Sequence, residues 1–228
     1  MFRFPAFSRV SAALLALIVT MPTMMAVHAQ DYPVIVNKEE RPDPWIVNGC
    51  KIVPKSNCEG ADLRHADLKH ANLFGANLQN AKLTRADLRH ANLTNANLTG
   101  ANLDAAKLQY AFLPGANLSG ASLRGADLTY VRGAKANFTN SDLSAANLEA
   151  AFLKGGNFLG AIFRNADLQE TKLYEANLTY AVLEGAKLKF TIFQDAVMDD
   201  CSGCPMNWQY GEKPWEQDES RWEPAAGQ

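Results

Sequence analysis

The sequence predicts an all-β solenoid, because a five-residue motif repeats without insertion over residues 61–200. Each of the 28 successive pentads begins with a small residue, which is Ala in 23 of them. Two places later each pentad carries a central residue, which is Leu in 22 of them. An internal repeat of this regularity dictates the fold before local propensities do. The first two pentads are Ala61-Asp62-Leu63-Arg64-His65 and Ala66-Asp67-Leu68-Lys69-His70.

A period of five excludes the ordinary elements. In an α-helix, a step of five residues turns by about 140°, so the leucines would spread over every face. In a flat strand, an odd step sends successive leucines to opposite faces. The pattern is satisfied when the chain turns once per pentad. The small and central residues then face inward, the residue between them faces outward, and the last two form a corner.

These pentads resemble the pentapeptide-repeat family, whose pattern is A-(D/N)-L-x-x. The resemblance covers about 140 of the 228 residues. It implies a right-handed, four-sided (quadrilateral) parallel β-helix with four pentads per coil, and therefore about seven coils. With coils about 4.8 Å apart, the rod would be roughly 34 Å long. Solenoid ends expose core and unpaired strand edges, so we expect a cap at both ends.

The first 29 residues are expected to be a secretory signal peptide. Arg3 and Arg9 make the start of the chain positively charged. The apolar run over residues 12–19 is too short to span a bilayer. Val27-His28-Ala29 resembles a cleavage site, and an uncleaved membrane anchor is the alternative. No later segment is long and apolar enough to span a membrane. The mature protein is therefore expected to be periplasmic or secreted, after cleavage near Ala29.

Segments on either side of the repeats are the expected caps. Residues 30–60 form an N-terminal lead-in and cap, which contains Cys50 and Cys58, and residues 201–228 form a Trp-rich capping tail. In this tail Trp208, Trp215 and Trp222 are the candidate cap or interface. A platform that binds a sugar or a partner is the alternative interpretation of these three rings.

The four cysteines lie in pairs at opposite ends of the repeats. A disulfide requires Cα atoms within about 7 Å, so a rod of the expected length permits only the disulfides Cys50–Cys58 and Cys201–Cys204. The same distance excludes one shared zinc site. Cys201 and Cys204 also have the spacing of a redox motif. The preceding Asp199 and Asp200 disfavour the thiolate that redox chemistry needs, and a thiol–disulfide redox role stays the alternative.

Sorting outward residues by twenties assigns each to one side of the rod. At one corner His70, His90, Tyr110 and Tyr130 follow one another; the rings lapse at Ala150 and Glu170 and return at Phe190. Rings about one strand spacing apart can stack, so these four are the candidate interaction strip. Aromatic residues that merely cover turns are the alternative. His65 could join His70 and His90 at a metal, but only two would align, so no metal site is predicted.

Two other sides have a distinct character. One carries an amide ladder, interpreted as structural because stacked amides can hydrogen-bond along it: Asn77, Asn97, Asn117, Asn137, Asn157 and Asn177. Another carries Phe74, Phe112, Pro114, Phe152 and Tyr174, while the last coils add outward Ile162, Val182, Ile192 and Val197. Contiguous apolar surface usually marks an interface. The tail therefore covers this C-terminal end, or two rods meet there as a homodimer.

One pentad breaks the pattern, because Gly133 stands where a large central residue is expected. Loss of a core leucine costs several kcal/mol unless the space is refilled. We therefore expect a bulge or bend at residues 131–135, with the large Phe138 leaning into the gap.

The charge of the rod and the motifs in the sequence disfavour several classes of function. Residues 61–200 contain 14 Lys or Arg and 14 Asp or Glu, so the rod is neutral. The family includes gyrase-protecting proteins whose acidic rods imitate DNA; neutrality and export disfavour that topoisomerase-interacting role. Nucleic-acid binding would need a basic stripe, which is also missing. The filled core and the lack of catalytic motifs predict no enzyme, no catalytic residue and no cofactor.

The sequence therefore predicts a non-catalytic, exported scaffold or protein-binding module. The expected partner is a protein or another component of the periplasm or cell envelope. Neither nucleic acid nor, after signal cleavage, a membrane is an expected partner.

Overall fold

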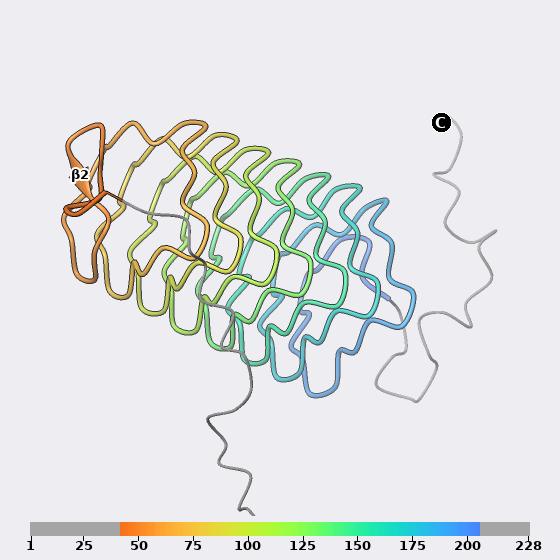
Figure 1. Ribbon diagram of the computed structural model, residues 1–228. Coiled ribbons are helices and arrows are strands. Elements are labelled where there is room, and N and C mark those ends of the chain that lie inside the picture. Colours follow the sequence, from red (N-terminus) through yellow and green to blue (C-terminus); the bar gives the residue numbers. More distant parts are fainter. Residues whose placement is uncertain (1–41, 206–228) are drawn as a thin grey trace, which may run out of the picture. The chain divides into compact units, whose positions relative to one another are not determined.

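The computed structural model describes residues 42–205 of the chain, and Figure 1 shows these residues as coils that follow one another along one axis. Two regular strands, β1 (Ile46–Val47) and β2 (Cys50–Lys51), precede the coils. The predicted signal peptide with its cleavage near Ala29, and the predicted tail with Trp208, Trp215 and Trp222, lie outside the described residues.

Strands β1 and β2 form an antiparallel hairpin, in which Ile46 pairs with Lys51 and Val47 with Cys50. Asn48 and Gly49 connect them with φ values of 47° and 82°. Two positive φ values in a two-residue loop define a type I′ turn, for which Asn-Gly is the favoured sequence. Only a lead-in and cap was expected here, although the Asn-Gly pair is a hairpin signal in the sequence.

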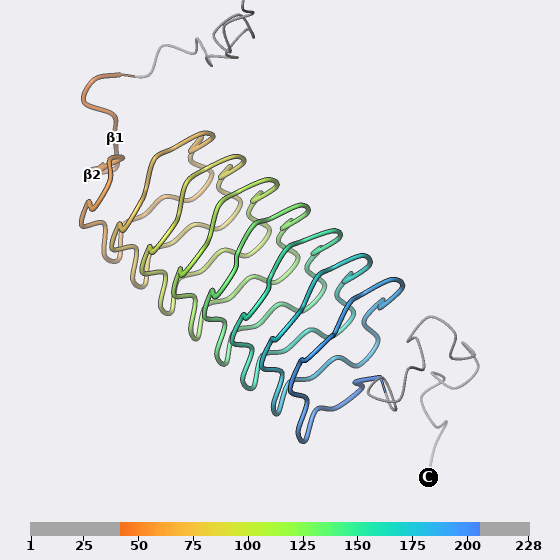
Figure 2. The same ribbon diagram turned by 90° about the horizontal axis from the view of Figure 1, so that it is seen from below.

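Parallel bridges between residues 20 apart set the register of the coils. Lys82, for example, is bridged to Asp62 on one side and to Asn102 on the other, and such bridges run from Asn57↔Asn77 to Val182↔Ser202. The backbone N–H of Leu63 donates to the carbonyl of Lys82 at 2.8 Å, and the N–H of Lys82 donates to the carbonyl of Ala61 at 2.9 Å. Each coil therefore holds four pentads, as the resemblance implied, and Figure 2 shows the same stacking after a quarter turn.

The core consists of the first and central residues of the pentads. From Leu63 to Leu183, almost every such side chain is 0–1% exposed, and Phe138, Phe158 and Phe163 are the largest of them. Three polar residues replace Ala in this core without losing a hydrogen bond. The hydroxyl of Ser141 donates to the carbonyl of Phe138, that of Thr171 to Leu148, and that of Thr191 to Leu168. Burial of this apolar column is the main stabilising term.

A tight turn with a left-handed residue closes every corner. The N–H of Ala66 donates to the carbonyl of Leu63, and His65 between them has φ 59°. This arrangement is a type II turn, whose third residue needs a positive φ. All fifth residues of the pentads from Lys55 to Asp200 have φ values of 53–69°. The frequent Gly and Asn residues at the fifth position of the pentads have their cause here.

Because the corner residue has a positive φ, Ala145→Gly is expected to raise the free energy of unfolding by up to about 1 kcal/mol. A non-Gly residue in the left-handed region costs roughly 1–2 kcal/mol, and the extra backbone entropy of Gly offsets part of that gain. Ala145 is exposed and has φ 56°. Urea unfolding followed by circular dichroism measures the change. Ala146→Gly, at the next and buried position, should be destabilising instead, and equal effects at both positions would contradict the explanation.

The expected bulge at residues 131–135 was wrong. The N–H of Gly133 donates to the carbonyl of Phe152 at 2.8 Å, and Arg132 keeps its bridges to Phe112 and Phe152. Glycine retains the backbone groups that the coil uses, so the ladder continues through it. A Cβ atom built on Gly133 would lie 2.9 Å from Cδ2 of Leu153, so Leu153 occupies the space. Phe138 instead stacks on Phe158, with ring centroids 4.9 Å apart.

Candidate functional site

The four residues of the predicted strip form one continuous stack of rings. Centroids are 4.9 Å apart for His70 and His90, 5.1 Å for His90 and Tyr110, and 5.1 Å for Tyr110 and Tyr130, and neighbouring rings are within 6° of parallel. The spacing follows the distance between neighbouring coils. Bulky residues rarely adopt a positive φ, yet these four have φ values of 56–59° because they occupy corners.

This stack lies beside an apolar column on the adjoining side of the rod. Two residues after each corner comes the outward middle residue of the next pentad, so Phe112 follows Tyr110 and Arg132 follows Tyr130. Five of the large apolar side chains that are at least 37% exposed lie on these two columns: Tyr110, Phe112, Tyr130, Phe152 and Phe190. We call the two columns the aromatic edge. They comprise His70, His90, Tyr110, Tyr130, Ala150, Glu170 and Phe190 with Asn72, Asn92, Phe112, Arg132, Phe152, Lys172 and Ile192.

The aromatic edge is hollowed where the rings lapse. One hollow of about 470 Å³ is lined by Tyr110, Tyr130, Val131, Arg132, Ala150, Phe152 and Lys172. A second hollow of about 470 Å³ is lined by Tyr130, Ala150, Glu170, Lys172, Phe190 and Ile192. Because they share Tyr130, Ala150 and Lys172, the two hollows form one groove from Tyr130 to Phe190, which we call the notch.

Two cations at the notch have no carboxylate partner among residues 42–205. Arg132 lies over the ring of Phe112, 5.7 Å from its centroid, and Lys172 lies two coils further along the same column, with Phe152 between them. Several other cations on the rod are paired, among them Arg89 with Asp87 at 2.6 Å, Arg124 with Asp104 at 2.7 Å, and Lys187 with Asp167 at 3.1 Å. Such exposed pairs contribute little stability. The notch thus combines rings with two unpaired positive charges, and Glu170 is the one carboxylate in its lining.

The pKa of the His90 imidazole depends on the position of this ring inside the stack. Partial burial lowers the pKa of His90 below its ordinary value, and the nearby His70 and Arg89 lower this pKa further. A base whose pKa is lower in the folded state binds fewer protons there than in the unfolded chain. This contribution therefore favours folding above about pH 6.5 and is lost as the pH falls below that value.

A second prediction follows for the pH dependence of stability. The melting temperature of the protein should fall between pH 7.5 and pH 5.0, and His90→Tyr should make this fall smaller because it keeps a ring in the stack without an ionisable imidazole. Thermal unfolding at both pH values measures the difference. His65→Tyr, at a corner outside the ladder, is the control. An unchanged pH dependence in His90→Tyr would contradict the assignment.

The considered metal site does not form. His65 occupies a different corner column, together with Arg85 and Ala105, so it does not join the ladder. The rings of His70 and His90 lie parallel, with an interplanar angle of 2°, rather than converging on a point. Within the part of the chain that the structure describes, no group of three or more His, Cys, Asp or Glu is placed to hold a metal ion.

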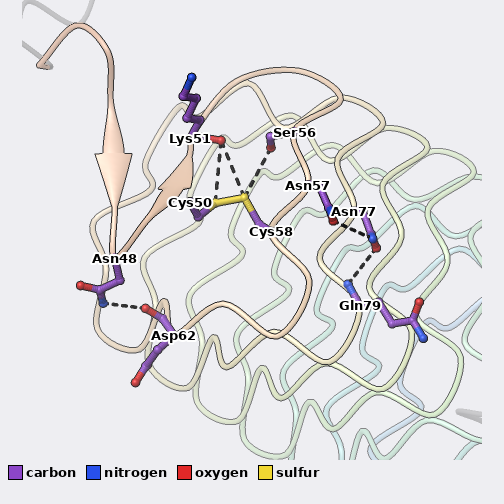
Figure 3. The surroundings of a disulfide bond; sticks show 9 residues. All are labelled: Asn48, Cys50, Lys51, Ser56, Asn57, Cys58, Asp62, Asn77 and Gln79. Atoms are coloured by element: carbon purple, nitrogen blue, oxygen red, sulfur yellow. Dashed lines mark hydrogen bonds between the residues drawn. A yellow bond between two sulfur atoms is a disulfide. The ribbon is translucent and has the colours of Figure 1, made fainter.

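The predicted amide ladder is present, and its groups hydrogen-bond within the ladder. The side-chain amide of Asn77 donates to Asn57 at 2.9 Å (Figure 3), and that of Asn137 donates to Asn117 at 3.0 Å. Between such pairs, Thr99 accepts a bond from Asn117 at 2.9 Å. The amide oxygens also accept backbone N–H groups two residues later, as in Asn97 with Thr99. Because its polar groups are used internally, this side serves the rod's own structure.

Disulfides in the structure join the cysteines in the two predicted pairs. Cys50 and Cys58 have Cα atoms 5.2 Å apart and link β2 to the first coil (Figure 3). The side chain of Asn48 adds a bond to the carbonyl of Asp62 at 2.7 Å, while Trp45 and Val47 pack against the buried core. Cys201 and Cys204 have Cα atoms 5.7 Å apart.

The segment that carries the second disulfide lies close against the preceding coil. Ser202 is bridged to Val182, and its hydroxyl donates to the carboxylate of Glu184 at 2.7 Å. A Cβ atom on Gly203 would lie 2.7 Å from the backbone nitrogen of Glu184. Central residues Leu188 and Met198 are only partly buried near this end, whereas the central Leu98 in the middle of the rod is 0% exposed. The outward residue Val197 is 47% exposed. The apolar C-terminal end expected from the sequence is therefore present.

The sequence pattern predicted the ring ladder but not the notch. Phe112 and Phe152 were expected on a separate side, and neither Arg132 nor Lys172 was a candidate residue. The available signal was the offset of two residues between a corner and the next outward position, which brings these columns together. No helix within residues 42–205 has the length and apolar character needed to cross a bilayer.

The chain matches a protein-family model and is similar to several solved structures. The model described as "Pentapeptide repeats" matches in eight copies, over overlapping segments between residues 53 and 202. The chain therefore belongs to the pentapeptide-repeat family, whose fold is a right-handed quadrilateral β-helix. No curated protein matches the chain.

Three solved structures illustrate the range of similar proteins. HetL from the cyanobacterium Nostoc sp. strain PCC 7120, involved in heterocyst differentiation regulation, is 34% identical; the match covers 64% of this chain and 75% of HetL, with a TM-score of 0.44. Rfr23 from the cyanobacterium Cyanothece 51142 is 34% identical over 44% of this chain and 65% of its own, with a TM-score of 0.38. QnrB1, a plasmid-mediated fluoroquinolone resistance protein, is 17% identical over 68% and 76%, with a TM-score of 0.37.

Proposed function

We propose that this protein is a non-catalytic, exported scaffold that binds a protein partner of the periplasm or cell envelope through its aromatic edge. The observation that carries this proposal is the gathering of exposed rings on one edge of a rod whose other sides are largely polar. Contiguous exposed apolar surface on a folded protein usually marks an interaction site. Aromatic and Arg side chains are the residue types that dominate binding energy in protein interfaces.

Two further points support the non-catalytic part. The core positions are filled by Ala, Leu and Phe side chains that are almost completely buried, so the interior offers no pocket for a substrate. The comparisons indicate no enzyme family, and pentapeptide-repeat proteins are generally structural or binding proteins.

Export rests on the sequence of residues 1–29, with its basic start, short apolar run and cleavage-like Val27-His28-Ala29. Disulfides persist in oxidising compartments, so the pairs Cys50–Cys58 and Cys201–Cys204 agree with that location. The proposal also includes about seven coils over residues 61–200, an N-terminal cap around the β1–β2 hairpin, and a C-terminal cap made by the tryptophan-rich tail.

The test compares capture of a partner by matched variants. Purified protein is cross-linked in an envelope extract, and bound proteins are identified by mass spectrometry. The double variant Tyr110→Ala/Tyr130→Ala should lose the specific partner. Tyr180→Ala should retain it, because Tyr180 is 60% exposed at a left-handed corner of another column.

Two outcomes would overturn the proposal. In one, capture is the same for the double variant and for Tyr180→Ala. In the other, the protein reduces a disulfide substrate and Cys201→Ser abolishes that activity, which would establish the redox alternative. Size-exclusion chromatography with light scattering tests for a homodimer that forms through the C-terminal end. A monomer at high concentration would exclude this homodimer.

A further inference from the structure

The ring stack ends with one open face. One face of Tyr130 lies against Tyr110, with centroids 5.1 Å apart and planes within 6°. The next residue of the same column is Ala150, which has no ring, and both residues line the notch. The opposite face of Tyr130 therefore borders a position that a fifth ring would occupy if the ladder continued.

The space at this position is large enough for an aromatic side chain. Two successive corners, Ala150 and Glu170, lack rings before Phe190 restores one, and each of the overlapping hollows holds about 470 Å³. This volume is at the low end of the range of about 300–1,000 Å³ for ligand pockets. Aromatic rings gain roughly 0.5–1.5 kcal/mol from stacking beyond the burial of their area. An inserted ring would find Tyr130 on one side and the apolar Phe152 beside it.

The charge of the notch indicates which chemical group would bind beside an inserted aromatic ring. Arg132 and Lys172 have no carboxylate partner within residues 42–205, so they are available to an incoming anion. Hydrogen bonds between Arg or Lys and a carboxylate are roughly twice as strong as neutral ones. Glu170 lines the far half of the notch, and the rod has 14 basic and 14 acidic residues over residues 61–200. A polyanion would meet Glu170 and would lack a basic stripe, so a single carboxylate is the better complement.

We propose that the notch binds an aromatic side chain flanked by a carboxylate, presented by an acidic segment of a protein partner. The ring stacks on the open face of Tyr130, and the carboxylate pairs with Arg132 and Lys172. The inference rests on the proposed function and deepens it, because it names the chemistry of the partner and the point at which the partner docks.

Synthetic peptides probe this inference directly. The purified protein, with its tyrosine rings isotope-labelled, is titrated by nuclear magnetic resonance with the capped peptide Gly-Asp-Tyr-Asp-Gly, and Tyr130→Phe assigns the resonance of Tyr130. The two control peptides replace the Tyr by Ala or both Asp by Lys. The first peptide should shift the Tyr130 resonance and bind at least tenfold more tightly than either control. Lys172→Gln should weaken its binding and reduce the salt dependence.

A variant that fills the position from within provides the decisive comparison. Ala150→Tyr should continue the stack, keep or raise the melting temperature, and weaken binding of the Asp-Tyr-Asp peptide at least tenfold. Ala145→Tyr is the matched control, since Ala145 and Ala150 are both corners, with φ values of 56° and 54°, and Ala145 lies outside the notch. It should bind the peptide as the unmodified protein does.

Three results would overturn the inference: equal binding by Ala150→Tyr and the unmodified protein, equal binding of the Lys-Tyr-Lys peptide, or tighter binding of adenosine monophosphate than of the acidic peptide.

Failure of this inference is distinguishable from failure of the proposed function. If capture of the partner needs Tyr110 and Tyr130 but is unchanged by Ala150→Tyr, the scaffold function stands and the notch is not its docking point. If the peptide binds but no partner depends on the aromatic edge, the proposed function fails.

Discussion

Replacing Leu98 by Ala is expected to lower the free energy of unfolding by about 2–5 kcal/mol. Leu98 is 0% exposed and lies in the column of Leu78 and Leu118, one coil to either side. The backbone prevents collapse around the lost side chain, because the N–H of Leu98 donates to Asn117 at 2.7 Å and the N–H of Asn97 donates to Ala76 at 2.9 Å. The cavity therefore stays open, which adds to the lost burial.

Leu188→Ala is the matched control for this truncation. Leu188 is a central residue of the same kind near the C-terminal end, where it is only partly buried. Its truncation should cost clearly less than that of Leu98. Urea unfolding followed by circular dichroism measures both, with the slope of the transition checked for each variant because repeat proteins can lose cooperativity. Equal losses at the two positions would refute the view that burial within the coil stack sets the cost.

Gly156→Ala is expected to destabilise the protein by about 1–3 kcal/mol, although it restores the commonest residue of the repeat. A Cβ atom on Gly156 would lie 2.7 Å from Cε2 of Phe158 and 3.0 Å from the carbonyl oxygen of Leu153. The ring of Phe158 has little room to yield. Its centroid is 4.9 Å from that of Phe138 and 5.4 Å from that of Phe163.

A double-mutant cycle tests this cause. Phe158→Leu alone should be destabilising, because it removes a large buried side chain. Adding Gly156→Ala in that background should cost much less than it does alone, since the added methyl group no longer meets a ring. Interaction energies between contacting residues reach about 0.5–3 kcal/mol. Additive effects of the two substitutions would contradict the proposed clash.

The pair of Gly156 and Phe158 illustrates what can be predicted from a repeat. The pentad pattern predicts that both residues face inward, and both do. Each departs from the commonest residue, in opposite directions of size, and only their contact explains why they occur together. Gly133 and Leu153 show the same relation, because Leu153 fills the space that Gly133 leaves. The expected bulge failed here because it treated one coil without its neighbour.

The candidate site divides in the same way. Counting by twenties was sufficient to align His70, His90, Tyr110 and Tyr130, because residues 20 apart are direct neighbours in adjacent coils. The notch depends on two columns at once and on a ring that is absent from Ala150. Neither the order of residues nor their spacing expresses the shape of a surface across a corner. The β1–β2 hairpin was a different omission, since its Asn48-Gly49 turn is readable from the sequence.

The sequence by itself determined the repeat, the inward and outward positions and the place of the corners, because all three depend on geometry within five consecutive residues. Only the tertiary structure decided which outward residues share a surface and which cations lack a partner. Those properties arise between coils, where side chains that are 20 or more residues apart meet. The physical reason is that a solenoid is regular along its backbone, whereas its surface chemistry depends on contacts between neighbouring coils and neighbouring sides.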